Sequence, residues 1–284
     1  MMPKPFAVLC APIYEKDYMM TQIKMVATDI DGTIVKWDTG FSDNVKNCIK
    51  KLCASGVKVV LVTGRMHCAT THIVNELGLT TPVVSYQGGL IKDSSGTTLY
   101  QKNLDSETAK KIIKWAEKNN VHINLYIDDK LYVEKDNDFV KKYTDGKFVS
   151  YNVCPFNSLK IENVNKILAI DYNDADRVTG WVDELQKAFP ELYIVKSTPY
   201  FCEIGSSDAK KSLGVEFLAK HWGLKKEEIL TIGDQNNDIE LLKAGGVAVA
   251  MGNATDELKA YANYITDTVE NDGFVKAVEK FILH

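Results

Sequence analysis

The sequence is poor in arginine. Arg65 and Arg177 are the only two, and the formal net charge is -4. A nucleic-acid-binding domain needs a basic patch or stripe that lies against the phosphates. The sequence has no such stripe, so we exclude nucleic acid as a partner.

Long apolar runs are also missing. No run approaches the eighteen or so apolar residues that a transmembrane helix needs. Residues 5–13 are mildly apolar, but Pro12 interrupts them and the charged residues 15–17 follow at once, unlike a signal peptide. We therefore expect residues 1–20 to be a disordered leader or an over-long start, with Met19, Met20 and Met25 as possible true starts. We exclude a membrane as a partner.

Cysteine spacing gives no sign of a metal site or of a disulfide framework. The six cysteines form no CxxC pair, and no histidine stands at zinc-finger spacing from them. Free, reduced thiols are typical of cytosolic proteins. We expect a cytoplasmic protein; the sequence gives no indication of its oligomeric state.

Apolar runs and helical spacings alternate in the first and last thirds of the chain. Short buried strands are expected at 24–30, 57–62 and 82–86, with helices at 41–54 and 68–77 between them. The last third repeats the pattern, with strands at 228–232, 247–251 and 264–266. Alternating strands and helices are typical of a parallel α/β sheet. We predict a Rossmann-like, doubly wound parallel sheet.

The middle of the chain has a different character. Paired strands follow one another directly, with helices between the pairs, which favours an antiparallel α+β module. The simplest architecture is a core formed by residues 21–87 and 195–284. An α+β cap domain, residues 88–194, is inserted into it.

Polar residues cluster at the carboxyl ends of three of the expected core strands, at 29–33, 63–65 and 233–238. Open α/β sheets bind ligands at the carboxyl ends of their strands. Several carboxylates converging there would repel one another without a cation among them. Magnesium prefers hard oxygen ligands, so the pattern predicts a Mg²⁺ site.

The spacing in Asp29-Ile30-Asp31-Gly32-Thr33 favours catalysis. Two aspartates separated by one residue after a strand can face the same ligand, one as a nucleophile and the other as a general acid/base. A carboxylate that attacks phosphorus needs neighbouring positive charge, which magnesium and a lysine can supply.

Four motifs in order resemble the haloacid dehalogenase superfamily: Asp29-x-Asp-Gly-Thr, Thr63-Gly-Arg, a lysine before a helix, and Gly233-Asp-x-x-Asn-Asp. Two segments of the C-terminal part, Ala250-Met-Gly-Asn-Ala and Asn271-Asp-Gly, are similar to its Cof-type subfamily, which carries a large α/β cap. The resemblance covers residues 24–284. It implies a magnesium-dependent phosphatase that acts on a small phosphorylated metabolite, such as a sugar phosphate.

The resemblance also implies roles for individual residues. Asp29 would form an aspartyl-phosphate and bind magnesium, and Asp31 would act as the acid/base while its carbonyl binds the metal. Asp234 would bind the metal directly, with Asp238 behind it.

Phosphate binding would fall to Thr63, to the amide of Gly64 and to Asn237. Gln87 stands where the family often has Asn-Gly and is expected near the substrate. The motif lysine is Lys211 when the chain is aligned on Leu218-Ala219, and Lys210 remains an alternative.

Two other functions compete. A phosphosugar mutase of the same superfamily must grip a second phosphate, for which arginines in the cap suit best; the cap offers only Arg177. A non-catalytic phosphate-binding module would be expected to lose Asp29 or Asp31, and both are present. The sequence therefore favours the phosphatase.

Overall fold

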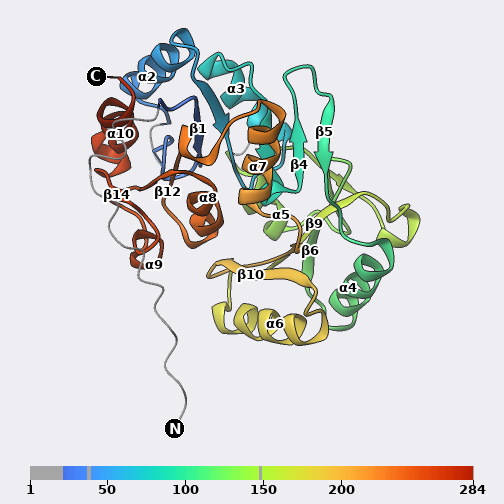
Figure 1. The fold of residues 1–284 in the computed structure, drawn as a ribbon. Coiled ribbons are helices and arrows are strands. Elements are labelled where there is room, and N and C mark those ends of the chain that lie inside the picture. Colours follow the sequence, from blue (N-terminus) through green and yellow to red (C-terminus); the bar gives the residue numbers. More distant parts are fainter. Residues whose placement is uncertain (1–21, 37–39, 147–148, 284) are drawn as a thin grey trace.

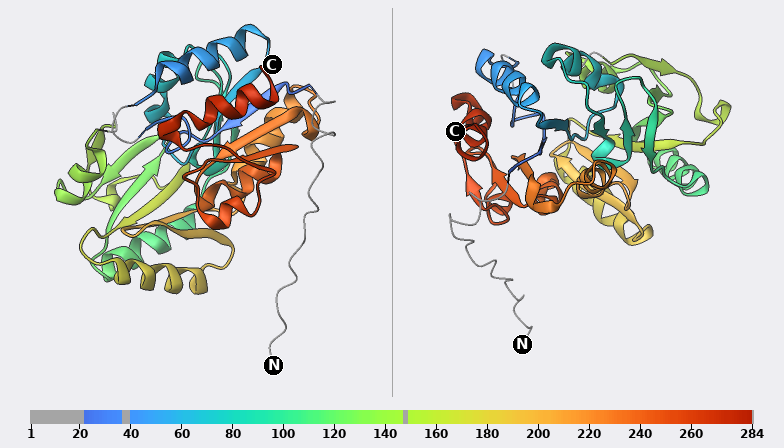
Figure 2. Two further views of the ribbon diagram at one scale, coloured as in Figure 1. Left: turned by 90° about the vertical axis from the view of Figure 1, so that its left-hand side faces the viewer. Right: turned by 45° about the horizontal axis from the view of Figure 1, so that its top comes forward.

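The structure is a computed structural model, and it describes residues 22–36, 40–146 and 149–283. The expected leader, residues 1–20, lies outside these ranges. Within them the chain forms two units, each built on a β-sheet, that lie side by side in Figure 1 and in both views of Figure 2.

The core sheet has five parallel strands in the order β14–β13–β12–β1–β2. Its strands are β1 (Met25–Thr28), β2 (Lys58–Leu61), β12 (Ile229–Gly233), β13 (Val247–Ala250) and β14 (Tyr264–Ile265). The sequences of β1, β12 and β13 are entirely buried, as expected for parallel strands covered on both faces.

Helices cover both faces of this sheet. Val26 belongs to one apolar cluster with residues of α2, α3 and α10, whereas Met25 and Ala27 belong to another with residues of α7 and α8. The core helices are α2 (Asp43–Ala54), α3 (Thr71–Leu77), α7 (Lys211–His221), α8 (Ile239–Ala244), α9 (Asp256–Lys259) and α10 (Gly273–Phe281). The predicted doubly wound parallel core is confirmed.

A small antiparallel sheet extends the core beyond β2. It consists of β3 (Val83–Ser85), β4 (Leu90–Lys92) and β5 (Thr98–Gln101). Val84 of β3 forms a parallel bridge with Val62, directly after β2. The first residues of the expected insertion therefore lie beside the core sheet.

The second unit is a six-stranded sheet in the order β10–β11–β9–β6–β7–β8. Its strands are β6 (His122–Ile127), β7 (Lys130–Val133), β8 (Tyr151–Val153), β9 (Val164–Ile170), β10 (Leu192–Thr198) and β11 (Phe201–Ser206). It also holds α4 (Ser106–Lys118), α5 (Asp138–Thr144) and α6 (Ala175–Ala188). Every pairing is antiparallel except β7 with β8. The predicted inserted α+β module is confirmed as a fold.

The expected boundary between residues 194 and 195 falls inside β10. Residues of β10 on both sides of this point pair with β11, and β11 pairs with β9. The second sheet therefore continues to Ser206. We call residues 102–206 the cap.

Each face of the cap sheet has its own apolar cluster. Residues of α4 and α6 cover one face. The other face meets the core, where Tyr126 of β6 lies edge-on against Tyr86, with ring centroids 6.1 Å apart. Short 3₁₀ turns occur at Cys68–Thr70, Tyr86–Gly88, Phe156–Ser158, Lys226–Glu228, Asn236–Asp238 and Val269–Asn271.

No helix in the described residues is both long and apolar enough to span a bilayer. Five of the six cysteines lie in the described ranges, and all five are free thiols, as the sequence predicts.

Candidate active site

The order of the core strands gathers the sequence motifs at one edge. Asp29 follows β1 and donates its backbone N–H to Ile232 O of the neighbouring β12, at 3.0 Å. Asp234 follows β12, and Thr63 follows β2 on the other side of β1. The carboxyl ends of parallel strands meet at one edge of a sheet, so Thr33 and Asp234 lie in contact although they are 201 residues apart in the sequence.

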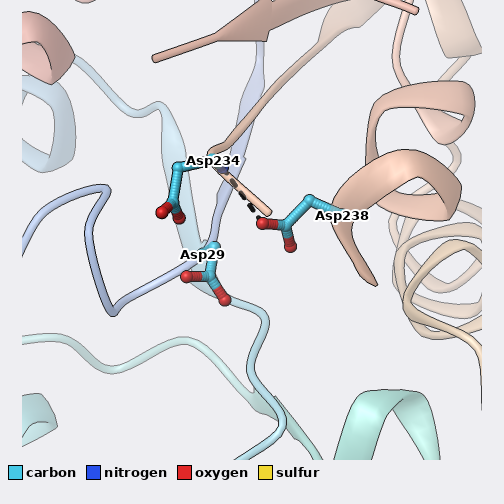
Figure 3. Close-up of side chains that lie close together, drawn as sticks. All are labelled: Asp29, Asp234 and Asp238. Atoms are coloured by element: carbon cyan, nitrogen blue, oxygen red, sulfur yellow. Dashed lines mark hydrogen bonds between the residues drawn. The ribbon is translucent and has the colours of Figure 1, made fainter. Parts of the chain in front are cut away.

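Asp29, Asp234 and Asp238 form a buried carboxylate cluster. Their side chains lie close together in Figure 3, and each offers an oxygen within 4.8 Å of the others. Burial raises the pKa of Asp29 well above its ordinary value, with the charge of Lys211 opposing that rise. Burial and the charge of Asp238 raise the pKa of Asp234 to about 6. Both shifts mark a site that lacks positive charge.

Lys211 lies inside this cluster. Its Nζ lies 2.6 Å from Asp29 Oδ1 and 2.5 Å from Asp238 Oδ1, and its side chain is 1% exposed. Burial alone would lower the pKa of Lys211, but the charges of Asp238 and Asp29 outweigh burial and raise it. One ammonium against three carboxylates leaves the site short of positive charge.

Hydrogen bonds fix the other two carboxylates. Asp234 accepts from Thr33 Oγ1 at 3.0 Å and from Gln235 Nε2 at 2.9 Å. Asp238 Oδ2 accepts from the backbone N–H group of Asp234 (Figure 3) and from that of Gln235, both at 3.1 Å. Because Lys211 binds Oδ1 and the two amides bind Oδ2, both oxygens of Asp238 are held in place.

The cluster suits a small hard cation. Its donors are carboxylate oxygens, the type that Mg²⁺ prefers, and they are few enough to leave room for water and substrate oxygens. The raised pKa values of Asp29 and Asp234 show that added positive charge would stabilise the ionised site. The residues present therefore fit Mg²⁺, with Asp29 and Asp234 as the expected ligands.

The turn after β1 brings Asp31 to the mouth of the site. Gly32 makes this possible, because its φ of +75° suits glycine and a Cβ there would lie 2.4 Å from Asp234 Oδ2. Arg65 binds both oxygens of Asp31, with Nε to Oδ2 at 2.8 Å and Nη2 to Oδ1 at 2.5 Å. The Asp31 side chain remains 30% exposed, so a substrate can reach it.

Four residues expected to bind phosphate or substrate lie together beside Asp31. Thr63 is buried, and Gln87 donates its backbone N–H to Thr63 O at 3.0 Å. The Gln87 side chain covers Gly64, where a Cβ would lie 2.5 Å from Gln87 Nε2. Asn237 Nδ2 donates to Gln87 Oε1 at 3.3 Å. The structure thus brings Thr63, Gly64, Gln87 and Asn237 into one loop cluster.

The position of α7 distinguishes the two candidate lysines. Lys211 is the first residue of α7 and enters the carboxylate cluster, whereas Lys210 is exposed at the helix start. Close packing sets this orientation, because a Cβ on Gly214 would lie 2.4 Å from Val84 Cγ1 of β3.

Two cap residues reach the core beside the site, and sequence reasoning missed both roles. Lys166 Nζ of β9 donates to Gly64 O at 3.3 Å. Asp129, in the β6–β7 turn, accepts from the backbone N–H groups of His67 and Cys68, both at 2.9 Å, and from Tyr86 Oη at 2.8 Å. No local motif marks these residues, because their partners lie far away in the sequence. The grip of Arg65 on Asp31 was also missed; the scarcity of arginine was the available signal.

Comparison with known proteins agrees with this geometry. Residues 26–278 match the family described as haloacid dehalogenase-like hydrolase. The chain is 29% identical to the 5-amino-6-(5-phospho-D-ribitylamino)uracil phosphatase YcsE of Bacillus subtilis over 261 residues, covering 92% of this chain and 96% of that protein. It is 27% identical to YitU, a phosphatase of the same name and organism, over 93% of this chain and 99% of that protein.

Solved structures give the same result. A haloacid dehalogenase-like hydrolase from Bacteroides thetaiotaomicron superposes with a TM-score of 0.84 at 26% identity, covering 92% of this chain and 100% of that one. The Thermotoga maritima protein TM0651 superposes with a TM-score of 0.82 at 30% identity, covering 91% and 97%. The chain therefore belongs to the haloacid dehalogenase-like hydrolase family, and within it to the phosphatases.

Proposed function

We propose that this chain is a Mg²⁺-dependent phosphatase that hydrolyses a small phosphate monoester through an aspartyl-phosphate on Asp29. One observation carries the proposal: Asp29 lies at a strand end, with Lys211 Nζ 2.6 Å from one of its oxygens and an Asp234 oxygen within 4.8 Å of an Asp29 oxygen. A nucleophilic carboxylate needs positive charge beside it before it can approach a phosphate, and Lys211 and a cation held by Asp234 would supply that charge.

In the first step, an Asp29 oxygen bonds to phosphorus as the bond from phosphorus to the leaving oxygen breaks. Asp31, exposed at the mouth of the site, gives its proton to the leaving alkoxide. Bound Mg²⁺ would neutralise charge on the phosphoryl oxygens, held by Asp29, Asp234 and the Asp31 carbonyl. The Lys211 ammonium, 2.6 Å from Asp29 Oδ1, orients the Asp29 carboxylate and offsets its negative charge.

In the second step, Asp31 takes a proton from water, the water oxygen bonds to phosphorus, and the bond from phosphorus to Asp29 breaks. Thr63, the Gly64 amide and Asn237 would hold the phosphoryl oxygens, since they line the same loop cluster. Asp238 keeps Lys211 and the loop after β12 in position rather than touching substrate.

The structure gives no support to the two alternatives, a phosphosugar mutase and a non-catalytic phosphate-binding module. Arg177 lies on α6, which packs on the cap face opposite the core, and its guanidinium binds Asp171 and Asn119 O. It is therefore poorly placed to grip a second phosphate for a mutase. A non-catalytic binding module has no need of the Asp31–Arg65 pair. We also propose a cytoplasmic location, which the free thiols support.

A screen of phosphate monoesters tests the proposal, with released phosphate as the readout. We expect hydrolysis in Mg²⁺, none in excess chelator, and recovery when Mg²⁺ is restored. Ca²⁺ should substitute poorly because its coordination is larger and looser. Full activity in chelator would contradict the metal role, and no hydrolysis of any ester would contradict the phosphatase.

A further inference from the structure

The cap places a buried charge directly above the phosphate-binding loop. Lys166 of β9 has a side chain only 9% exposed, yet its contacts are long: Gly64 O at 3.3 Å and Glu203 Oε2 at 3.4 Å. Its Nζ also lies 5.2 Å from the ring centroid of Tyr126. An ammonium can donate three hydrogen bonds, so these contacts leave it able to bind an oxygen of a ligand.

Strand register puts four residues in one row on this face of the cap. Tyr126 pairs with Lys166, and Tyr193 pairs with Gly205. Ile204 pairs with Ile167, so Gly205 and Lys166 are the next pair in register. Directly opposed residues share a face of a sheet. The row across β6, β9, β11 and β10 therefore faces the core, as the contact of Lys166 with Gly64 O requires.

Gly205 leaves an opening in the middle of this row. It is buried, yet a Cβ built there would have no heavy atom within 4 Å. The opening has Lys166 on one side and Tyr193 on the other, with Glu203 two residues away on the same strand face. We call Lys166, Tyr193, Glu203 and Gly205 together the cap slot.

The cap slot lies beside the phosphate-binding loop, because Lys166 Nζ donates to Gly64 O at 3.3 Å. The pKa of Tyr193 is raised to about 12, first by burial and then by the charge of Glu203, while the charges of Lys211 and Asp238 also act on it. A leaving group that extends from a phosphate held at Gly64 therefore meets the slot.

We infer that Lys166, Glu203 and Tyr193 select the leaving group of the substrate and favour a neutral polyhydroxy one. The open space at Gly205 would accommodate that group. This inference rests on the proposed function and adds the residues that read the substrate. A hydroxyl can accept from the Lys166 ammonium and donate to the Glu203 carboxylate at once. A polyol or sugar presents such hydroxyls in pairs, and the Tyr193 ring offers a flat wall beside them.

Charge balance argues against an anionic leaving group. Lys166 and Glu203 are 3.4 Å apart, so the slot carries no net charge. A second phosphate or a carboxylate would meet Glu203 at close range without an added cation. A neutral polyhydroxy group uses both partners and leaves neither unpaired in a buried site.

The test compares three probes: glucose 6-phosphate, fructose 1,6-bisphosphate and 4-nitrophenyl phosphate. The wild type should favour glucose 6-phosphate over the bisphosphate. Lys166→Met and Glu203→Gln should each lower kcat/KM for glucose 6-phosphate by about thirtyfold, mainly through KM, which is the order expected for a lost charged hydrogen bond. Both variants should keep 4-nitrophenyl phosphate hydrolysis within about threefold, because that ester carries no hydroxyls.

Filling the slot gives a second, independent variant. Gly205→Val places its side chain in open space, so the protein should fold. It should lower kcat/KM for glucose 6-phosphate more than for 4-nitrophenyl phosphate. Lys196→Met is the matched control, because Lys196 on β10 binds Ala175 O and Thr179 Oγ1 of α6, on the opposite face. It should behave as wild type with every probe.

The outcomes separate the two proposals. Equal losses on all probes, no losses, or preference for the bisphosphate would overturn the role of the cap slot. So would a wild type that hydrolyses only 4-nitrophenyl phosphate, although the phosphatase assignment would then stand. A wild type that hydrolyses none of the three would overturn both.

Discussion

The Arg65 guanidinium grips both oxygens of Asp31, with the pairs Nε–Oδ2 and Nη2–Oδ1 at 2.8 and 2.5 Å. A bidentate pair of this kind fixes the plane of the carboxylate as well as its distance. In the proposed mechanism, Asp31 must lie within hydrogen-bond distance of the leaving oxygen to protonate it. Arg65 is thus a positioning residue for the acid/base.

Arg65→Lys should impair leaving-group protonation selectively. A lysine keeps the charge but cannot hold both oxygens, so we expect kcat for an alkyl phosphate to fall by about tenfold or more, the value of one charged hydrogen bond. Hydrolysis of 4-nitrophenyl phosphate should fall much less, since its leaving group needs little protonation. Arg177→Lys is the matched control and should change neither rate. Equal losses on both esters would refute the positioning role.

Lys211 and Lys210 should behave in opposite ways. Lys211→Ala removes the ammonium from between Asp29 and Asp238, so the rate should fall roughly a hundredfold or more. Lys210→Ala alters an exposed side chain and should stay near wild type. Steady-state kinetics of the two purified variants, with circular dichroism to verify folding, make the comparison. If Lys210→Ala were the crippled variant, the assignment of Lys211 would be wrong.

Asp129 should hold the cap against the loop that follows Thr63. Asp129→Asn turns an NH₂ group toward one of the two amide donors, which breaks a hydrogen bond and adds a donor–donor clash. We expect faster hydrogen exchange at the amides of His67 and Cys68 and a KM raised severalfold. Asp128→Asn is the matched control in the same turn. Unchanged exchange in Asp129→Asn would show that the cap is held by other contacts.

The ionisation of Asp234 should appear as pH-dependent stability in chelator. Its pKa in the fold is about 6, above its ordinary value of 3.8. The stability that it contributes is therefore fully present below about pH 4 and is lost as the pH rises through 6. Asp234→Asn cannot ionise, so its Tm should rise relative to wild type between pH 4 and pH 6 and then level off. A Tm difference that stays constant with pH would contradict this. Adding Mg²⁺ at pH 7.5 should stabilise the wild type alone.

The core and its motifs could be predicted because they depend on local signals. Buried β1 and β12 have mostly apolar sequences, and the charged residues after them can only lie at the carboxyl edge of a parallel sheet. Asp29, Asp31 and Asp234 could therefore be expected at one place before their contacts were known.

The contacts between cap and core could not be predicted in this way. Lys166 reaches Gly64 O across 102 residues, and Asp129 reaches His67 across 62. Each depends on how the cap sheet docks, which no short spacing encodes. The extent of the cap was misjudged for a related reason: β10 and β11 follow the cap helices in sequence but pair with β9, so the return to the core comes after Ser206.

Asp29→Asn tests the central claim most directly. The substitution keeps the size of the side chain and removes the attacking charge. Phosphate release from 4-nitrophenyl phosphate by the folded variant should fall to the uncatalysed background, whereas Asp43→Asn, which changes an exposed acid in α2, should match wild type. Turnover of Asp29→Asn near the wild-type rate would contradict covalent catalysis by Asp29.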